Sequence, residues 1–187
     1  MCGKIEAETI SRVGISIEPV GVIKNNLKVP PLIAGKEGLK LNGAYESAIT
    51  EMSETYERIS EIILADELDD LLDGIEDYSH IVVIYWGHQI TEVARKLTKV
   101  HPAGREDNPL KGIYSTCSPA RPNPILMTVV RLIKRDRNRL LVCGLDAIDN
   151  SPVLDIKPYV PDLFPKEDVL IPDWMETIIK GFLENRY

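Results

Sequence analysis

Residues 125–145 read ILMTVVRLIKRDRNRLLVCGL, and this stretch sets the fold class that the sequence predicts. Two runs of apolar and β-branched residues, 125–135 and 139–145, flank the charged segment KRDRN at 134–138. Such runs around a short polar segment predict a β-hairpin with a charged tip. Further strands are expected at 15–23, 59–64, 80–88 and 112–116. Because these strands do not alternate regularly with helices, the sequence predicts a mainly β protein, an antiparallel sheet or barrel.

Helical patterns are few and short. Apolar residues recur at helical spacing in 44–58 and in 173–186, and an acidic helix over 66–75 is expected to stop at Gly74. The segment 25–43 contains prolines and glycines and is expected to be a long loop. We therefore predict one domain over residues 1–161 and a C-terminal helical extension over 162–187.

Composition limits the classes of protein to which the chain can belong. The 187 residues are 44% apolar, which suffices for a core, and no apolar run reaches the length of a membrane span. The first twenty residues contain no apolar signal-peptide core, and the three cysteines form no C-x-x-C pair. These features predict a cytoplasmic protein with reduced thiols and no membrane partner. The net charge of −7 argues against a protein that binds nucleic acid over its whole surface, but it is compatible with a local basic patch.

The common cofactor and metal motifs are missing. The sequence contains no G-x-G-x-x-G, no P-loop and no H-E-x-x-H. His80 and His88 fall on one predicted strand, which would separate them by roughly 26 Å, too far to share a metal ion. No metal site is therefore predicted, and taken alone each histidine suits an ordinary hydrogen-bonding role.

The segment SPARPNP at 118–124 combines stiffness with polar side chains. Its three prolines fix backbone angles and remove hydrogen-bond donors. They hold Arg121 and Asn123 at a rigid corner before the next strand. Asn123 can both donate and accept hydrogen bonds, whereas Arg121 suits a carboxylate or a phosphate. The alternative is a structural turn in which Arg121 pairs with an acidic residue.

Four segments in order resemble the TrmO family of tRNA methyltransferases over about residues 16–161. They are EPVGVIKN (18–25), LLDGIEDYSHIVVIYWGHQ (71–89), GIYSTCSPARPNPILMTVV (112–130) and GLDAIDNSPVLDIKPYVP (144–161). The resemblance implies a small antiparallel β-barrel that binds S-adenosylmethionine without a Rossmann fold and forms a homodimer. It further implies methylation of the exocyclic N6 of threonylcarbamoyladenosine, at position 37 of the tRNA anticodon loop.

The resemblance also assigns roles to individual residues. The implied cofactor-binding residues are His88, Gln89, Ser118, Pro119, Val129, Leu145, Asp146, Ala147 and Ile148. The implied catalytic residues are Arg121, Asn123, Asp155, Lys157 and Tyr159. Strand alternation puts the last three of these on one face, with Ile156 on the other. That trio either orients the substrate or forms a hydrogen-bonded cluster that closes the barrel or a dimer.

Three departures from the family pattern concern the methyl acceptor. Cys117 stands where the family has arginine, Leu126 replaces a glycine, and Asn150-Ser151 replaces Gly-Thr. Two alternatives therefore stay open. One is a barrel that binds S-adenosylmethionine and regulates a partner without catalysis. The other is methylation of a different amine.

A route for tRNA binding is predicted at the hairpin tip. Five cations lie within residues 131–139: Arg131, Lys134, Arg135, Arg137 and Arg139. Acidic residues concentrate in 51–77 and 162–176, so a polarised surface is expected, with the positive tip facing the RNA. The alternative is a solvated charged turn.

Overall fold

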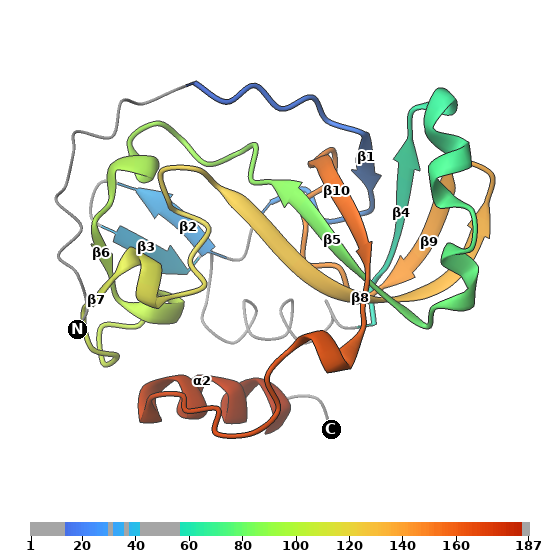
Figure 1. Cartoon of the computed structure of the whole chain (residues 1–187). Coiled ribbons are helices and arrows are strands. Elements are labelled where there is room, and N and C mark those ends of the chain that lie inside the picture. Colours follow the sequence, from blue (N-terminus) through green and yellow to red (C-terminus); the bar gives the residue numbers. More distant parts are fainter. Residues whose placement is uncertain (1–13, 30–31, 36–37, 42–56, 185–187) are drawn as a thin grey trace, which may run out of the picture.

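Six antiparallel strands close into a barrel in the computed structural model, which describes residues 14–29, 32–35, 38–41 and 57–184. Around the barrel the order is β1, β10, β5, β8, β9 and β4, and β4 pairs with β1 to close it (Figure 1). The strands are β1 (Gly21–Lys24), β4 (Ile59–Leu64), β5 (His80–Trp86), β8 (Ile125–Asp136), β9 (Arg139–Cys143) and β10 (Pro152–Pro158). The prediction of a mainly β fold with a small antiparallel barrel is confirmed.

The barrel interior is filled by alternate residues of its strands. On β5, Ile81, Val83 and Tyr85 are buried in the same cluster as Val130 of β8 and Ile62 of β4. Because successive strand residues point to opposite faces, their neighbours in the sequence lie on the outer surface. Full burial of each such aliphatic side chain contributes about 1.5–3 kcal/mol, so the period-2 pattern specifies which face turns inward.

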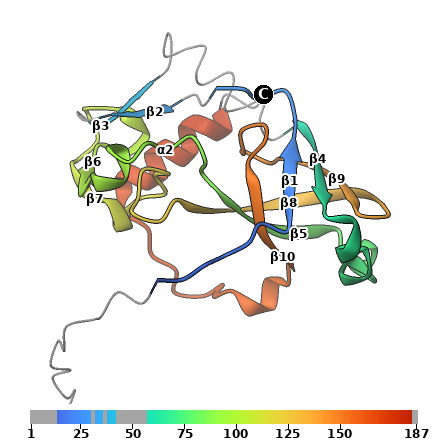
Figure 2. The same ribbon diagram turned by 90° about the horizontal axis from the view of Figure 1, so that it is seen from above.

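The antiparallel order gives the barrel two distinct ends (Figures 1 and 2). At one end, here named the loop end, lie the described segments 25–29, 87–124 and 144–151. At the other end, here named the hairpin end, lie the turn between β8 and β9 and two short 3₁₀ helices, η1 (Asp66–Leu72) and η2 (Ile75–Asp77).

The loop end carries two small sheets. β2 (Leu32–Gly35) pairs with β3 (Gly38–Leu41), so the loop predicted over 25–43 is wrong in part. β6 (Lys99–Val100) pairs with β7 (Lys111–Gly112), and 3₁₀ turns η3 (Ala94–Lys96), η4 (Pro102–Gly104) and η5 (Ile113–Ser115) complete this region. The strand predicted over 112–116 is therefore only its first residue, and η5 follows it.

Two further expectations differ from the structure. The strand predicted over 80–88 ends at Trp86. The N–H of Gly87 still donates to the carbonyl of Pro124 at 2.8 Å in the β5–β8 register, but Pro124 has no N–H to return, and the N–H of His88 turns back to the carbonyl of Trp86 at 2.8 Å. His80 and His88 consequently lie at opposite ends of the barrel. The acidic helix consists of η1 and η2, separated by Gly74 in the left-handed region at φ 82°. The helix predicted over 44–58 lies almost wholly outside the described residues.

Beyond β10 the chain leaves the barrel through η6 (Pro161–Leu163) and ends in the predicted C-terminal helix α2 (Asp173–Glu184), drawn below the barrel in Figure 1. The division into domains at residue 161 stays a prediction. Among the described residues, no helix combines the length and apolarity needed to cross a membrane.

Candidate functional site at the loop end of the barrel

Three segments that are far apart in the sequence meet at the loop end. The N–H of Gly87 donates to the carbonyl of Pro124 at 2.8 Å, which joins the end of β5 to the proline segment. A ring nitrogen of His88 lies 3.2 Å from the hydroxyl of Ser151 in the segment before β10. His88 therefore stands where the proline segment and the 144–151 segment come together. Partial burial lowers the pKa of His88, and the nearby Asp149 carboxylate opposes this shift in part.

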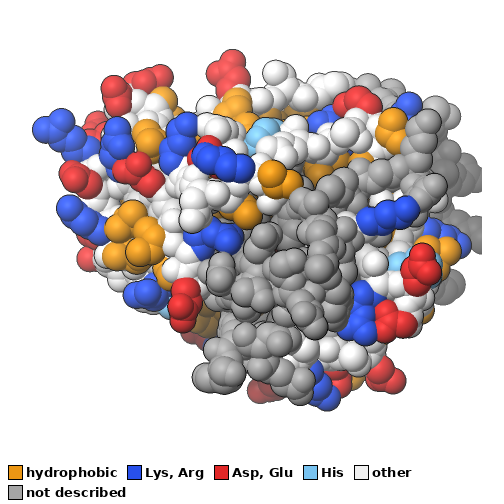
Figure 3. Space-filling model, turned by 180° about the vertical axis from the view of Figure 1, so that it is seen from behind, with side chains coloured by type: hydrophobic (Ala, Val, Ile, Leu, Met, Phe, Trp, Pro, Cys, Tyr) orange, Lys and Arg blue, Asp and Glu red, His pale blue; other side chains and the backbone are white. Residues whose placement is uncertain are grey.

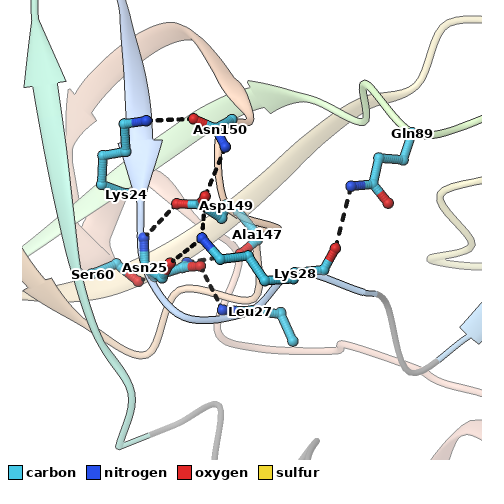
Figure 4. A network of polar contacts seen from close by, with 9 residues as sticks. All are labelled: Lys24, Asn25, Leu27, Lys28, Ser60, Gln89, Ala147, Asp149 and Asn150. Carbon is cyan, nitrogen blue, oxygen red and sulfur yellow. Dashed lines mark hydrogen bonds and ion pairs between the residues drawn. The ribbon is translucent and has the colours of Figure 1, made fainter.

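A polar network fixes the 144–151 segment (Figure 4). The buried Asp149 carboxylate accepts the N–H of Asn25 at 3.0 Å and the Lys28 ammonium at 2.5 Å. The Asn25 amide donates in turn to the carbonyl of Ala147 at 2.9 Å and to Ser60 at 3.1 Å. The pKa of Asp149 is lowered, first by the hydrogen bond from Lys28 and then by that from Asn25.

This network was missed at the sequence level. Asp149 and Asn25 appeared there only as members of two family segments, and nothing in the sequence paired them. The amide of Gln89 reaches the same turn, with its Nε2 donating to the carbonyl of Lys28 at 3.4 Å (Figure 4). Gln89 and the Leu145–Ile148 segment, predicted as cofactor-binding, are thus joined through one turn after β1.

Asp146 is held by groups from inside the barrel. Its neighbours Leu145 and Ala147 are fully buried, whereas Asp146 itself is exposed. The buried Tyr85 donates its hydroxyl to Asp146 Oδ1 at 2.7 Å, and the Thr128 hydroxyl donates to the same oxygen. Burial and then the Asp146 charge raise the pKa of Tyr85, so the phenol stays protonated and keeps donating. The carboxylate is thereby fixed at the mouth of the barrel with its second oxygen available.

In the proline segment, the Arg121 side chain hydrogen-bonds to backbone carbonyls of its own loop. Its Nε donates to the carbonyl of Ser118 at 2.9 Å and its Nη2 to the carbonyl of Thr116 at 2.8 Å. The guanidinium therefore holds the turn together, and no pairing with an acidic residue is found in the described chain. Asn123 is exposed, and its side chain makes no hydrogen bond with any described residue. Its amide is free to contact a ligand.

The other predicted catalytic residues do not join this group. Asp155, Lys157 and Tyr159 share one face, as predicted, and that face is the outer surface of the barrel, since Ile156 packs on the core. The Lys157 ammonium lies 2.6 Å from the Asp155 carboxylate. The Tyr159 ring stacks on Phe164 with centroids 5.4 Å apart, and its N–H binds the carbonyl of His80 at the hairpin end. Their catalytic role stays a prediction.

Two cofactor-site predictions also differ in placement. Ser118 is buried in the proline segment, where its hydroxyl accepts the N–H of Ala120 at 3.2 Å, and Pro119 is half-buried beside it. Val129 lies on the outer face of β8, away from the loop end, and is 39% exposed. Hydrogen bonds thus tie His88, Gln89 and the Leu145–Ile148 segment to common segments of the loop end, Ser118 and Pro119 lie in the proline segment of the same end, and Val129 lies apart.

The hairpin tip is neutralised by acidic residues. Arg135 donates to Asp69 and Asp73 at 3.0 Å and to Glu76 at 3.4 Å, which raises its pKa. Lys134 and Arg139 also have acidic partners, Asp136 at 3.6 Å and Glu61 at 3.1 Å. Seen from behind, Lys and Arg side chains stand among Asp and Glu over this end (left in Figure 3). The predicted separation of the acidic stretch from the tip is wrong, because η1 and η2 pack beside it. A tRNA contact at the tip stays a prediction.

Within the described residues no group of three or more His, Cys, Asp or Glu side chains is arranged to hold a metal ion. Two shallow hollows lie away from the loop end, one beside η6 and one at the hairpin end around Arg135. Neither hollow is lined by residues of the candidate site, which is built from three loops.

The fold and the site together define a class of protein: a closed antiparallel barrel whose polar, ligand-accessible side chains come from loops at one end. Residues 47–163 match the model of the tRNA-methyltransferase O N-terminal domain, and the chain belongs to this TrmO family of S-adenosylmethionine-dependent methyltransferases. The predictions of the family, of the enzyme class and of S-adenosylmethionine as cofactor are confirmed at this level.

Relatives agree with this assignment. A protein of Archaeoglobus fulgidus named an S-adenosyl-L-methionine-binding protein is 36% identical over 147 residues, which cover 79% of this chain and 91% of the relative. The crystal structure of TrmO from Pseudomonas aeruginosa superposes with a TM-score of 0.60 at 26% identity, over 84% of this chain and 61% of that one. Another TrmO crystal structure gives 0.61 at 28% identity, over 85% and 64%. The chain thus spans less than two thirds of the solved TrmO chains.

Proposed function

We propose that this protein transfers a methyl group from S-adenosylmethionine to the exocyclic N6 of threonylcarbamoyladenosine at position 37 of a tRNA anticodon loop. The observation that carries the proposal is the meeting of His88, the exposed Asn123 amide and the Leu145–Ile148 segment at the loop end. These are the segments that resemble the TrmO family most specifically. The family match over residues 47–163 supports tRNA as the substrate class.

The residues present suit the cofactor chemically. His88, Gln89 and the backbone of Leu145–Ile148 would hold S-adenosylmethionine, and the free oxygen of Asp146 offers an acceptor for its hydroxyl or ammonium groups. When bound, this cofactor supplies a methyl group activated by a sulfonium. Because His88 has a lowered pKa, its ring is neutral at pH 7 and does not repel that positive charge.

The chain contributes mainly positioning. Methyl transfer needs the acceptor nitrogen, the methyl carbon and the sulfur in line, and holding reactants in such a geometry can supply much of the rate gain. The prolines and the Arg121 contacts with Ser118 and Thr116 make the segment that carries Asn123 rigid before any ligand arrives. Little freedom is then lost on binding, which favours affinity and alignment. Asn123 would orient the base or the carbamoyl group.

The test is transfer to defined tRNA. Purified protein is incubated with S-adenosylmethionine and tRNA from cells that lack this methylation, and the nucleosides are analysed by mass spectrometry. We expect threonylcarbamoyladenosine to gain one methyl group, and tRNA without the threonylcarbamoyl group to stay unchanged. Absence of any methyl gain in tRNA under conditions of saturating cofactor would overturn the proposal.

A second candidate is a barrel that binds S-adenosylmethionine and regulates a partner. Two observations favour it: the Archaeoglobus fulgidus relative is named for binding alone, and an exposed thiol, Cys117, stands at the arginine position of the family. Cofactor binding without transfer to any RNA or other amine would support this candidate. Methylation of a different amine would appear as consumption of cofactor without methylated nucleoside once a mixture of cellular small amines and proteins is added as acceptor.

A further inference from the structure

A compact lobe separates the two motifs that flank the candidate site. The chain leaves the barrel at Gly87, forms residues 90–116, here named the insert lobe, and returns through the proline segment. Ala94, Val100 and Ile113 are buried in a small core of the lobe, separate from that of the barrel. The guanidinium of Arg95 lies over the ring of Trp86, 5.2 Å from its centroid, and docks the lobe on β5. The lobe is thus an ordered part of the loop end.

Three lysines of the insert lobe have no partner among the described residues: Lys96, Lys99 and Lys111. The arginines of the same lobe have partners, since Arg95 pairs with Glu92 at 2.8 Å and Arg105 with Asp107 at 2.5 Å. Lys99 and Lys111 stand on the paired strands β6 and β7, and Lys96 ends the turn just before them. The three cations therefore lie on one small sheet and the turn before it. Lys99 and Lys111 point to opposite faces of that sheet, because the register pairs Lys99 with Gly112 and Val100 with Lys111.

The two ends of the barrel differ in charge sign. The described loop-end segments 25–29, 87–124 and 144–151 contain seven Lys and Arg against five Asp and Glu. At the hairpin end, segments 65–80 and 131–139 contain five Lys and Arg against eight Asp and Glu. Within a chain of net charge −7, the positive excess sits at the end with the candidate site. A polyanion is attracted to that end and repelled from the other.

We infer that the insert lobe docks the RNA backbone, with phosphates contacted by the exposed Lys96 and Lys99 and, from the other side of the β6–β7 sheet, by Lys111. This inference rests on the proposed function, because it concerns how the same substrate is held. The lobe is bounded in the chain by His88 on one side and by Asn123 on the other. A base placed between those two residues therefore brings its flanking phosphates towards the lobe. Lysine suits this role as a flexible point charge for phosphate.

The experiment compares two matched variants of the full chain. One carries Lys96→Gln, Lys99→Gln and Lys111→Gln. The control carries Arg131→Gln, Lys134→Gln and Arg137→Gln, which removes three cations at the hairpin end. Affinity for substrate tRNA is measured over a range of salt concentrations with S-adenosylhomocysteine present. Each lost phosphate contact lowers the log–log salt slope by roughly 0.9, so the lobe variant should lose up to about 2.7 and the control nothing.

Cofactor affinity should stay at the wild-type value in both triple variants. Because Lys111 is half-buried, the pair Lys96→Gln and Lys99→Gln, both exposed, serves if the triple variant misfolds, with an expected loss of up to about 1.8 in slope. Unchanged affinity and slope in the lobe variant, with a wild-type protein that methylates tRNA, would overturn the docking of RNA on the lobe alone. A wild-type protein that neither binds nor methylates tRNA would overturn both proposals.

Discussion

The two ends of the barrel use similar residues in opposite ways. At the hairpin end, Arg135 donates to Asp69, Asp73 and Glu76, so a strongly cationic stretch of sequence is compensated within the fold. At the loop end, three lysines of the insert lobe and the side-chain amide of Asn123 have no partner among the residues that the structure describes. A cluster of cations in the sequence therefore does not by itself locate a binding site for a polyanion. What matters is which of those cations remain unpaired in the folded protein.

The largest expected effects come from the core beneath each end. Leu145→Ala at the loop end and Leu72→Ala at the hairpin end each remove a buried side chain, which should lower the free energy of unfolding by about 2–5 kcal/mol. Only Leu145→Ala should also weaken S-adenosylmethionine binding to the folded protein, because Asp146 and Ala147 follow it directly. Urea unfolding and calorimetry at low temperature measure the two quantities. Equal cofactor affinities in the two variants would contradict the assignment of the cofactor site to the loop end.

A pair of asparagines gives the next test. Asn123→Ala should reduce kcat/KM roughly 10- to 100-fold, the equivalent of about 1–3 kcal/mol for an unpaired polar partner, while the melting temperature is unchanged. Asn138 at the hairpin end donates to the carbonyl of Leu64 at 2.6 Å and to Asp66 at 2.8 Å. Asn138→Ala should therefore lower stability by about 1 kcal/mol and leave turnover intact. The reverse outcome, with Asn123→Ala unstable but fully active once folded, would make the proline segment structural.

His88 predicts a moderate pH effect that is confined to one end. Its pKa is lowered, so the ring is neutral at pH 7 and gains a proton only as the pH falls below about 6.5. The imidazolium then repels the sulfonium, and affinity for S-adenosylmethionine should drop by about 1 kcal/mol, or roughly fivefold. Protonation is disfavoured in the folded state, so stability should also decrease over the same fall in pH.

Two controls separate this effect from a general acid response. S-adenosylhomocysteine has no sulfonium charge and should bind with little dependence on pH. His88→Asn should abolish the pH dependence, whereas His80→Asn at the hairpin end should retain it. Isothermal titration between pH 5 and pH 8 measures all four cases. An identical pH profile for the two ligands would contradict the assigned position of His88.

The smallest effect is expected for Lys157. Its ion pair with Asp155 lies on the outer surface, with the two side chains 59% and 47% exposed, so Lys157→Ala should change stability by less than about 1 kcal/mol. Turnover should stay at the wild-type level if the loop end alone performs the reaction. A large loss of turnover with normal cofactor binding would instead indicate that Asp155, Lys157 and Tyr159 on the outer face belong to the catalytic site.

The fold was predictable because strand periodicity and burial act locally. The run at 59–64 forms β4 with the predicted bounds, and the hairpin of residues 125–145 forms β8 and β9. The end of β5 was not predictable in the same way. Residues 80–88 all suit a strand, yet the ladder stops at Trp86, because the partner of Gly87 in the β5–β8 register is Pro124, which has no N–H to donate. A tertiary partner ends that strand.

The site was predictable only in part, for a related reason. The resemblance placed His88, Asn123 and the Leu145–Ile148 segment, and the structure brings them to one end. The network around Asp149 joins it to Asn25 across 124 positions of sequence, and no local pattern marks such a partner. The ion pairs of Arg135 were missed for the same reason. Its partners Asp69, Asp73 and Glu76 lie about sixty residues earlier in the chain.

The single hydrogen bond between Gly87 and Pro124 has a consequence for divergence within the family. It closes the excursion from β5 to β8 at its base, so the chain leaves and re-enters the barrel at neighbouring positions, with the insert lobe of residues 90–116 between them. Doubling the length of a flexible excursion costs only about 0.6 kcal/mol in closure entropy. The insert lobe can therefore be lengthened, trimmed or replaced while His88 and the proline segment, which flank it, stay in register. Under the proposed docking of RNA on the lobe, an insert lobe transplanted from a relative offers a direct way to change the substrate.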